Sequence, residues 1–137
     1  MIATDLEVGL YVALVAARHA RHELFTVEHL LLALLDDRSA AEVLHSCACD
    51  IERLRESLQT FVADNTRILP PNSEATTQPM ASFRRVIERA IMYVQCTSKG
   101  RKEVTGANVL VSLFDEKDSH EVYYLHRQGV TRRHVST

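Results

Sequence analysis

Apolar residues recur every three or four positions along most of the chain, which is the spacing that gathers them on one face of an α-helix. This stripe is clear over 6–17, 51–62 and 83–94. The stretch 30–35 is apolar nearly all round, which predicts a buried, central helix. Since no segment shows the sustained alternation of a half-buried strand, the pattern predicts an all-α protein.

Polar residues next to these stretches predict where the helices begin. Thr26 and Asp50 can each accept hydrogen bonds from the free N–H groups of a first helical turn. Ser39 and Glu42 match a capping box, in which two side chains pair reciprocally with backbone N–H groups. We therefore predict a helix that begins at Ser39 and runs to about Cys47, between the helices that Thr26 and Asp50 start.

The segment 65–80 interrupts the helical pattern and holds every proline of the chain. Proline removes a backbone donor and blocks a continuing helix, so Pro70 and Pro71 mark a break. We predict a linker here, between a first half at 1–64 and a second half at 81–137.

The two halves resemble each other. A shift of 79 positions lays Thr26–Asp36 on Thr105–Asp115, and slightly different shifts align the flanking stretches. His29 then falls on Asn108, which predicts a similar buried hydrogen bond at both positions. We predict two four-helix repeats packed as one domain around a pseudo-two-fold axis, because one copy is too small to bury its own apolar faces.

The composition is that of an ordinary globular domain. The chain has 137 residues, of which 46% are apolar and 25% charged, with a net charge of −2. These values exclude a disordered chain, and no apolar run approaches the length of about 18 residues that indicates a membrane span. The first ten residues carry Asp5 and Glu7 but no basic residue, unlike a signal peptide. We therefore expect a cytoplasmic protein.

The charges are unevenly spread, with an acidic first half and a basic second half. The basic run 84–102 contains Glu88, and the overall charge is negative, so we expect no binding to nucleic acid. The three cysteines, Cys47, Cys49 and Cys96, fit no complete disulfide framework. We interpret them as small, buried and inert side chains of a reducing compartment.

The candidate chemistry is sparse. His19, His22 and Glu23 have the spacing that places three side chains on one helix face, and zinc accepts such ligands. A metal-dependent enzyme is therefore one hypothesis, although the spacing differs from the H-E-x-x-H motif of metalloproteases. The chain contains neither a G-x4-G-K-[ST] loop nor a G-x-S-x-G elbow. The sequence thus predicts no ATP site, no nucleophilic serine and no cofactor.

Three sequence blocks resemble the Clp N-terminal domain, the double helical repeat at the front of Hsp100 unfoldases. They are His22–Leu35, Glu103–Val111, and Thr77-Gln78-Pro79 followed by Phe83–Val86. Within this family the blocks are most similar to the ClpA branch. The alternatives are an N-domain of another branch, such as ClpC or ClpB, and a stand-alone Clp-repeat protein with a different partner.

The resemblance implies a non-catalytic docking role. In the ClpA branch this domain binds the adaptor ClpS, which brings substrates with destabilising N-terminal residues, and it is expected to contact substrates itself. The branch engages the ClpP peptidase and forms hexamers through ATPase modules that this chain lacks. The resemblance therefore implies that the isolated chain is a monomer.

The resemblance also implies an adaptor surface, which carries over by motif to Glu23, Glu28, Met80 and Arg85. The family usually has threonine where Met80 stands, so this chain lacks a hydroxyl there. Three of these residues also have a simpler interpretation. Glu28 would stabilise the positive end of a helix dipole wherever it lies in a first turn, Arg85 could pair with Glu88 on the helix surface, and Met80 could simply pack.

Overall fold

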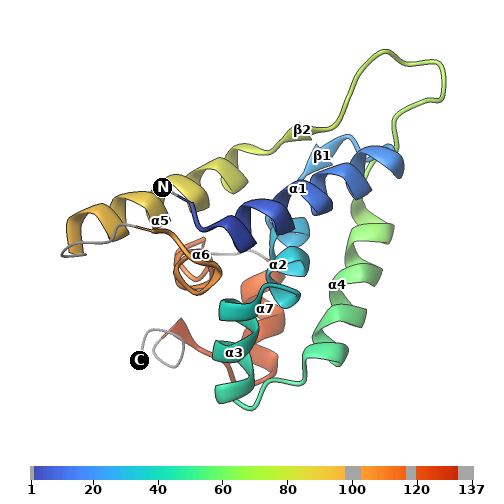
Figure 1. The fold of residues 1–137 in the computed structure, drawn as a ribbon. Coiled ribbons are helices and arrows are strands. Elements are labelled where there is room, and N and C mark those ends of the chain that lie inside the picture. Colours follow the sequence, from blue (N-terminus) through green and yellow to red (C-terminus); the bar gives the residue numbers. More distant parts are fainter. Residues whose placement is uncertain (1, 98–102, 117–119, 133–137) are drawn as a thin grey trace.

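The computed structural model describes residues 2–97, 103–116 and 120–132, which form a helical domain (Figure 1). The helices are α1 (Thr4–His19), α2 (Val27–Leu35), α3 (Arg38–Ser46), α4 (Ile51–Asn65), α5 (Ala81–Thr97), α6 (Gly106–Leu113) and α7 (His120–Arg127), with two short strands, β1 (Leu24–Phe25) and β2 (Gln78–Pro79). The all-α prediction is confirmed. Within the described residues, no helix combines the length and apolar character needed to cross a membrane.

Helix α2 is the centre of the domain, as its nearly continuous apolar sequence predicts. It packs against all six other helices (Figure 1). Leu30, Leu31 and Leu34 are completely buried. A helix surrounded in this way has no polar face, which explains why its sequence shows almost no amphipathic pattern.

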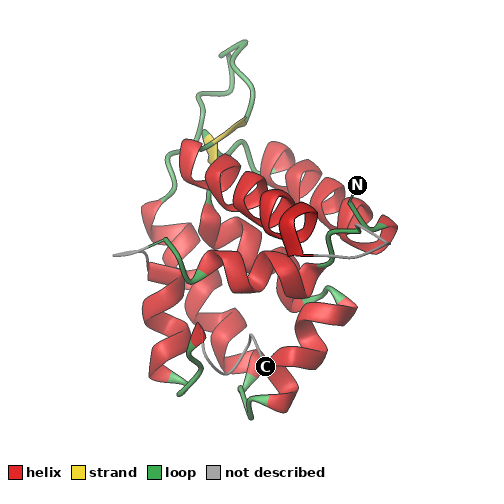
Figure 2. Cartoon of the chain, turned by 90° about the vertical axis from the view of Figure 1, so that its left-hand side faces the viewer, coloured by secondary structure: helices red, strands yellow, loops and turns green. Residues whose placement is uncertain are grey.

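The segment predicted as a linker pairs at its end with the first half of the chain. Strand β2 runs parallel to β1, with Leu24 opposite Gln78 and Phe25 opposite Pro79. Thr77, which is buried, donates a hydrogen bond from its hydroxyl to the backbone oxygen of His22 at 2.6 Å. Residues 66–77 form a loop that projects beyond the helices (Figure 2). Two-residue strands have no readable alternation, so the sequence pattern did not reveal them.

The helix starts predicted at Thr26 and Asp50 are confirmed. Thr26 accepts from the backbone N–H of His29 while His29 accepts from that of Thr26, which makes a capping box. Thr105 and Asn108 form the same box at the start of α6. The predicted hydrogen bond is therefore confirmed at both positions, since both side chains reach back to the residue that caps their helix, although Asn108 is only partly buried.

The start of α3 differs from the prediction. The cap is Asp37 rather than Ser39, and the helix begins at Arg38. The hydroxyl of Ser39 lies inside the first turn, where it donates to the Asp37 carboxylate at 2.9 Å and accepts from the backbone N–H of Ala107 at 3.0 Å. Glu42 pairs with Arg38 at 3.5 Å instead of reaching back to the cap. The Ser39 hydroxyl thus bonds to the start of α6, a contact that the local sequence does not predict.

The helices of the second half follow the order of those in the first. Helices α5, α6 and α7 occupy the chain positions that correspond to α1, α2 and α3, and Leu44 of α3 and Leu125 of α7 are both fully buried. The shift between the halves matches the cap Asp50 with Thr131, and the fourth helix expected to follow it lies outside the described residues beyond Arg132.

The prediction that the three cysteines are buried is wrong for Cys96. Cys49 is buried and Cys47 partly so, but Cys96 is exposed. Cys96 follows the buried Val94 by two positions on α5, and two helical positions turn a side chain by about 200°. It therefore faces away from the core.

Candidate docking site

The pairing of β1 with β2 brings Glu23 and Met80 to the two ends of one short sheet, although they are far apart in the sequence. Glu23 immediately precedes β1, and Met80 immediately follows β2. The backbone N–H of Met80 donates to the oxygen of Phe25 at 2.9 Å. The register separates Glu23 and Met80 by three strand positions, or about 10 Å along the strands. The Glu23 side chain is 38% exposed and Met80 is 40% exposed, so both are available to a partner.

Arg67 contacts Glu23 from the end of α4. The guanidinium lies 3.6 Å from a carboxylate oxygen of Glu23, and its backbone oxygen accepts from the Glu23 backbone N–H at 2.8 Å. An exposed pair of this kind contributes little to stability. A partner can therefore compete for the Glu23 carboxylate at small cost.

Arg85 lies in the second turn of α5 and pairs with a buried carboxylate. Its guanidinium donates to Glu116 at 3.0 Å, and Arg89 donates to the other oxygen of Glu116 at the same distance. The simpler interpretation, a surface pair with Glu88, is not seen among the ion pairs of the described residues. Burial raises the pKa of Glu116, but the hydrogen bonds and charges of the two arginines lower it by a larger amount. The pKa of Glu116 is therefore below its ordinary value. The Arg85 side chain remains 58% exposed.

Glu28 does not lie on the open surface. It occupies the first turn of α2, as the motif predicts, but only 8% of the residue is exposed. The cause is the central position of α2, which other helices surround. Its geometry fits the helix-dipole interpretation, since a carboxylate in a first turn stabilises the free N–H groups.

Three rings hold this region together. The buried ring of Phe25 stacks on His29 with centroids 5.2 Å apart, and Phe83 meets Phe25 edge to face at 5.1 Å. These contacts join β1, which Glu23 immediately precedes, to α2 and α5, which carry Glu28 and Arg85. The elements around the site are therefore packed together through these aromatic rings.

The three candidate metal ligands do not share a helix face. Helix α1 ends at His19, and the chain reverses at Arg21, whose φ of 59° lies in the left-handed region. His22 and Glu23 therefore leave in another direction, and His22 bonds to His29 at 2.9 Å. Across the residues that the structure describes, no three histidine, cysteine or acidic side chains are placed to hold a metal ion.

Sequence reasoning missed an apolar groove of about 440 Å³ between α1, α2 and α4. Its walls include Gly9, Val12, Ala13 and Ala16 of α1, Leu32 and Ala33 of α2, and Val62 of α4. On α1, large apolar side chains are exposed beside the groove: Val8 at 56%, Tyr11 at 65% and Val12 at 60%. The available signal was the row of small residues on α1, because small side chains leave space between packed helices.

Comparison with known proteins places this fold. The sequence profile of the Clp repeat (R) N-terminal domain matches residues 1–128. A ClpA homolog protein of Fuscovulum blasticum is 46% identical over 131 residues, which is 95% of this chain and 16% of that protein. The chain thus spans about one sixth of the length of this relative.

Solved structures agree on the fold at low sequence identity. The N-terminal domain of Hsp104 from Candida albicans superposes with a TM-score of 0.78 at 11% identity, covering 98% of this chain and 85% of that one. The ClpV N-domain, solved in complex with a VipB peptide, gives a TM-score of 0.71 at 14% identity, covering 96% and 80%. The profile match over nearly the whole length carries the conclusion that the chain belongs to the Clp N-terminal domain family.

Proposed function

We propose that this chain is the docking domain of a ClpA-type, ATP-dependent unfoldase of the cytoplasm. It has no catalytic activity of its own, and it binds the adaptor ClpS, which presents substrates with destabilising N-terminal residues for unfolding and degradation by ClpP. The 46% identity to a ClpA homolog protein supports this branch over ClpC, ClpB or a stand-alone protein. The observation that carries the docking role is the β1–β2 pairing, which gathers exposed Glu23 and Met80 beside the start of α5.

The charges of this surface suit an oriented encounter with a partner. Glu23 is acidic, Met80 is apolar, and Arg85 is basic and more than half exposed. Helical rise places Arg85 about 7 Å along α5 from Met80. Charges of opposite sign on either side of an apolar contact fix the orientation of a partner more than they raise its affinity. Met80 would supply the apolar contact.

Calorimetric titration with the ClpS of the same organism tests this proposal. Met80→Ala is expected to weaken binding about tenfold, the effect of removing one well-packed interface side chain. Glu23→Gln and Arg85→Gln should weaken it less and mainly slow association. Glu28→Lys is unsuitable because it would place a buried positive charge at the positive end of α2, and Arg85→Glu would face Glu116.

Matched controls separate binding from folding. Met92→Ala removes another exposed methionine, 63% exposed on α5, and should leave the affinity unchanged. Glu56→Gln on α4 is the corresponding control for Glu23→Gln, because it removes another exposed carboxylate and should also leave the affinity unchanged. If ClpS does not bind at all, the adaptor role is lost. If ClpS binds equally well to wild type and to the Met80, Glu23 and Arg85 variants, the role stands and this surface is wrong.

The groove between α1, α2 and α4 supports a second role, direct binding of a substrate segment. The occupant we favour is apolar and carries a basic residue, because Asp5, Asp36 and Asp37 line the groove against a single arginine, Arg55. Gly9→Leu should block the groove, because Gly9 lines it and a Cβ added at this position meets nothing within 4 Å that would prevent the substitution. Gly9→Ala, which leaves most of the groove open, is the control. Equal binding of an unfolded substrate protein by both variants would exclude this role.

A further inference from the structure

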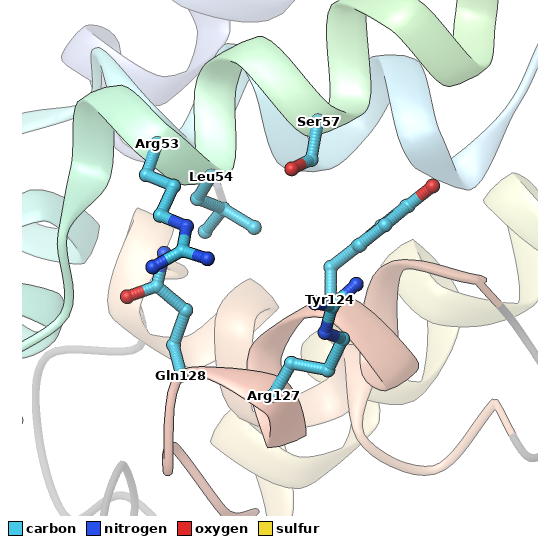
Figure 3. Close-up of a pocket in the computed structure, with 6 residues that line it drawn as sticks. All are labelled: Arg53, Leu54, Ser57, Tyr124, Arg127 and Gln128. Carbon is cyan, nitrogen blue, oxygen red and sulfur yellow. The ribbon is translucent and has the colours of Figure 1, made fainter.

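A small polar pocket lies between the start of α4 and the end of α7. Its volume is about 140 Å³, and it is lined by Arg53, Leu54 and Ser57 from α4, Tyr124 and Arg127 from α7, and Gln128 just after α7 (Figure 3). The site lies near the first turn of α4, whereas Arg67, the contact of Glu23, follows the last turn of that helix (Figure 1). The pocket is therefore separate from the proposed docking surface.

Two arginines at this pocket have no acidic partner within the described residues. Neither Arg53 nor Arg127 belongs to an ion pair there, whereas the neighbouring Arg55 contacts both Asp36 and Glu52. The six described lining residues include no carboxylate. The pocket therefore holds two positive charges that the described part of the fold does not neutralise.

The nearby acidic groups are engaged elsewhere. Glu52 turns toward Arg55, with 3.3 Å between carboxylate and guanidinium. The Asp50 carboxylate caps α4 by accepting from the backbone N–H of Arg53 at 3.1 Å. An anion entering the pocket would thus meet the two guanidinium groups of Arg53 and Arg127.

The walls of the pocket are fixed relative to each other. The amide of Gln128 donates to the backbone oxygen of Asp50 at 2.9 Å and accepts from its backbone N–H at 2.9 Å. This reciprocal pair joins the start of α4 to the end of α7. Leu54 is 1% exposed and anchors its wall in the core, and the Tyr124 ring packs edge to face on Phe61. The backbone walls of the pocket, together with the Gln128 amide and the Tyr124 ring, are therefore held in place before any ligand arrives.

The lining groups have the chemistry of a phosphate site. Guanidinium groups donate paired hydrogen bonds that match the oxygens of a phosphate, and the hydroxyls of Ser57 and Tyr124 are further donors. One water molecule occupies about 30 Å³ in the liquid, so 140 Å³ has room for several oxygen atoms. We propose that this pocket binds a phosphate group, either free or carried on a phosphorylated side chain of a partner protein.

Amide chemical shifts recorded during a titration of the 137-residue chain with inorganic phosphate test the proposal. We expect saturable shifts that centre on Arg53–Ser57 and Tyr124–Gln128. Arg53→Gln and Arg127→Gln should each weaken phosphate binding about tenfold, since a charged hydrogen bond is lost. Both side chains belong to exposed residues, so the fold should be retained. Arg84→Gln, an exposed arginine on α5, is the charge-matched control and should bind normally.

A second titration distinguishes the two sources of phosphate. A peptide that contains phosphoserine is compared with inorganic phosphate and with the unphosphorylated peptide. Tighter binding of the phosphopeptide than of phosphate assigns the pocket to modified proteins, and equal binding assigns it to free phosphate. Shifts that do not saturate, shifts centred elsewhere, or binding that survives both arginine substitutions would each overturn the proposal.

Discussion

Nδ1 of His22 lies 2.9 Å from Nε2 of His29, where both imidazoles line the apolar groove. The backbone N–H of Thr26 donates to Nδ1 of His29 at 3.1 Å, so that nitrogen carries no proton. His29 therefore holds its proton on Nε2 and donates it to Nδ1 of His22. This arrangement requires both rings to be neutral, because a proton added at either Nδ1 would place two donors face to face.

Acidification is expected to weaken the fold through His29. Burial, together with the charge of His22, lowers the pKa of His29 from 6.5 to about 4, and Glu28 opposes this only in part. Between these two values the unfolded chain binds the proton and the folded chain does not, so the free energy of unfolding falls as the pH falls. The difference corresponds to about 3 kcal/mol between pH 7 and pH 4. Urea unfolding at both pH values measures it.

His29→Asn is the matched control for this pH dependence, because Asn108 already fills the same place in the capping box of α6. The backbone N–H of Thr105 donates to Oδ1 of Asn108 at 2.9 Å, as that of Thr26 does to His29. His29→Asn should keep the capping box at pH 7 and remove most of the loss at low pH. Unchanged pH dependence in this variant would assign the titration to other groups.

The sequence predicts those parts of the fold that depend on local chemistry. Thr26, Thr105 and Asp50 cap helices because a side-chain oxygen meets the N–H group three residues on, whatever lies around it. The start of α3 was misplaced because Asp37 and Ser39 are both local cap candidates: Asp37 accepts from the N–H of Ala40, while the Ser39 hydroxyl accepts from that of Ala107, 68 residues away. The packing of the two halves about a pseudo-two-fold axis stays a prediction, supported by the matched capping boxes.

In the candidate docking site too, local sequence predicts one part and long-range contacts decide the other. The motif located Glu23, Glu28, Met80 and Arg85, but only the fold decides which of them are exposed. Glu28 is buried because α2 is surrounded by helices, and Arg85 finds its partner 31 residues away in Glu116. Long-range pairing of this kind leaves no periodic signal in the sequence.

The cysteines should differ strongly in their rate of alkylation. Cys96 is exposed, whereas burial, with smaller contributions from Asp50 and Cys47, raises the pKa of Cys49 to about 11. The reactive thiolate of Cys49 is therefore scarce at pH 8, and we expect its alkylation by iodoacetamide to be at least about a hundredfold slower than that of Cys96. Mass spectrometry of timed samples measures both rates. In urea the difference should largely disappear, and equal rates in the folded chain would contradict the burial of Cys49.

Two glycine substitutions should change stability in opposite directions. A side chain added at Gly106 would overlap the Asp37 carboxylate, which caps α3 and cannot move without releasing that helix. Gly106→Ala should therefore cost about 1–3 kcal/mol. Gly9 lies inside α1, and a Cβ added there would meet no other group within 4 Å, so Gly9→Ala should stabilise by about 0.5–1 kcal/mol. Thermal unfolding of the two variants checks both signs, and destabilisation by Gly9→Ala would mean that α1 packs more tightly than described.

Glu116→Gln should destabilise the fold more than Arg85→Gln, although both remove one partner of the same ion pair. A glutamine at 116 keeps one acceptor oxygen but turns its amide donor toward the other arginine. Arg85 is 58% exposed and can return to water, but Arg89 is held by its hydrogen bond to the backbone oxygen of Ser112 at 3.1 Å.

Arg89 therefore loses its charged acceptor, and we expect Glu116→Gln to lower the free energy of unfolding by about 1–3 kcal/mol. Arg85→Gln leaves the pair of Arg89 with Glu116 in place and should cost less than about 1 kcal/mol. Denaturant unfolding of both variants at pH 7 ranks them. A larger cost for Arg85→Gln would mean that Arg85 is a structural residue, and any effect of this variant on adaptor binding would then report on folding. The expected order leaves Arg85 free to contact a partner without weakening the domain that presents it.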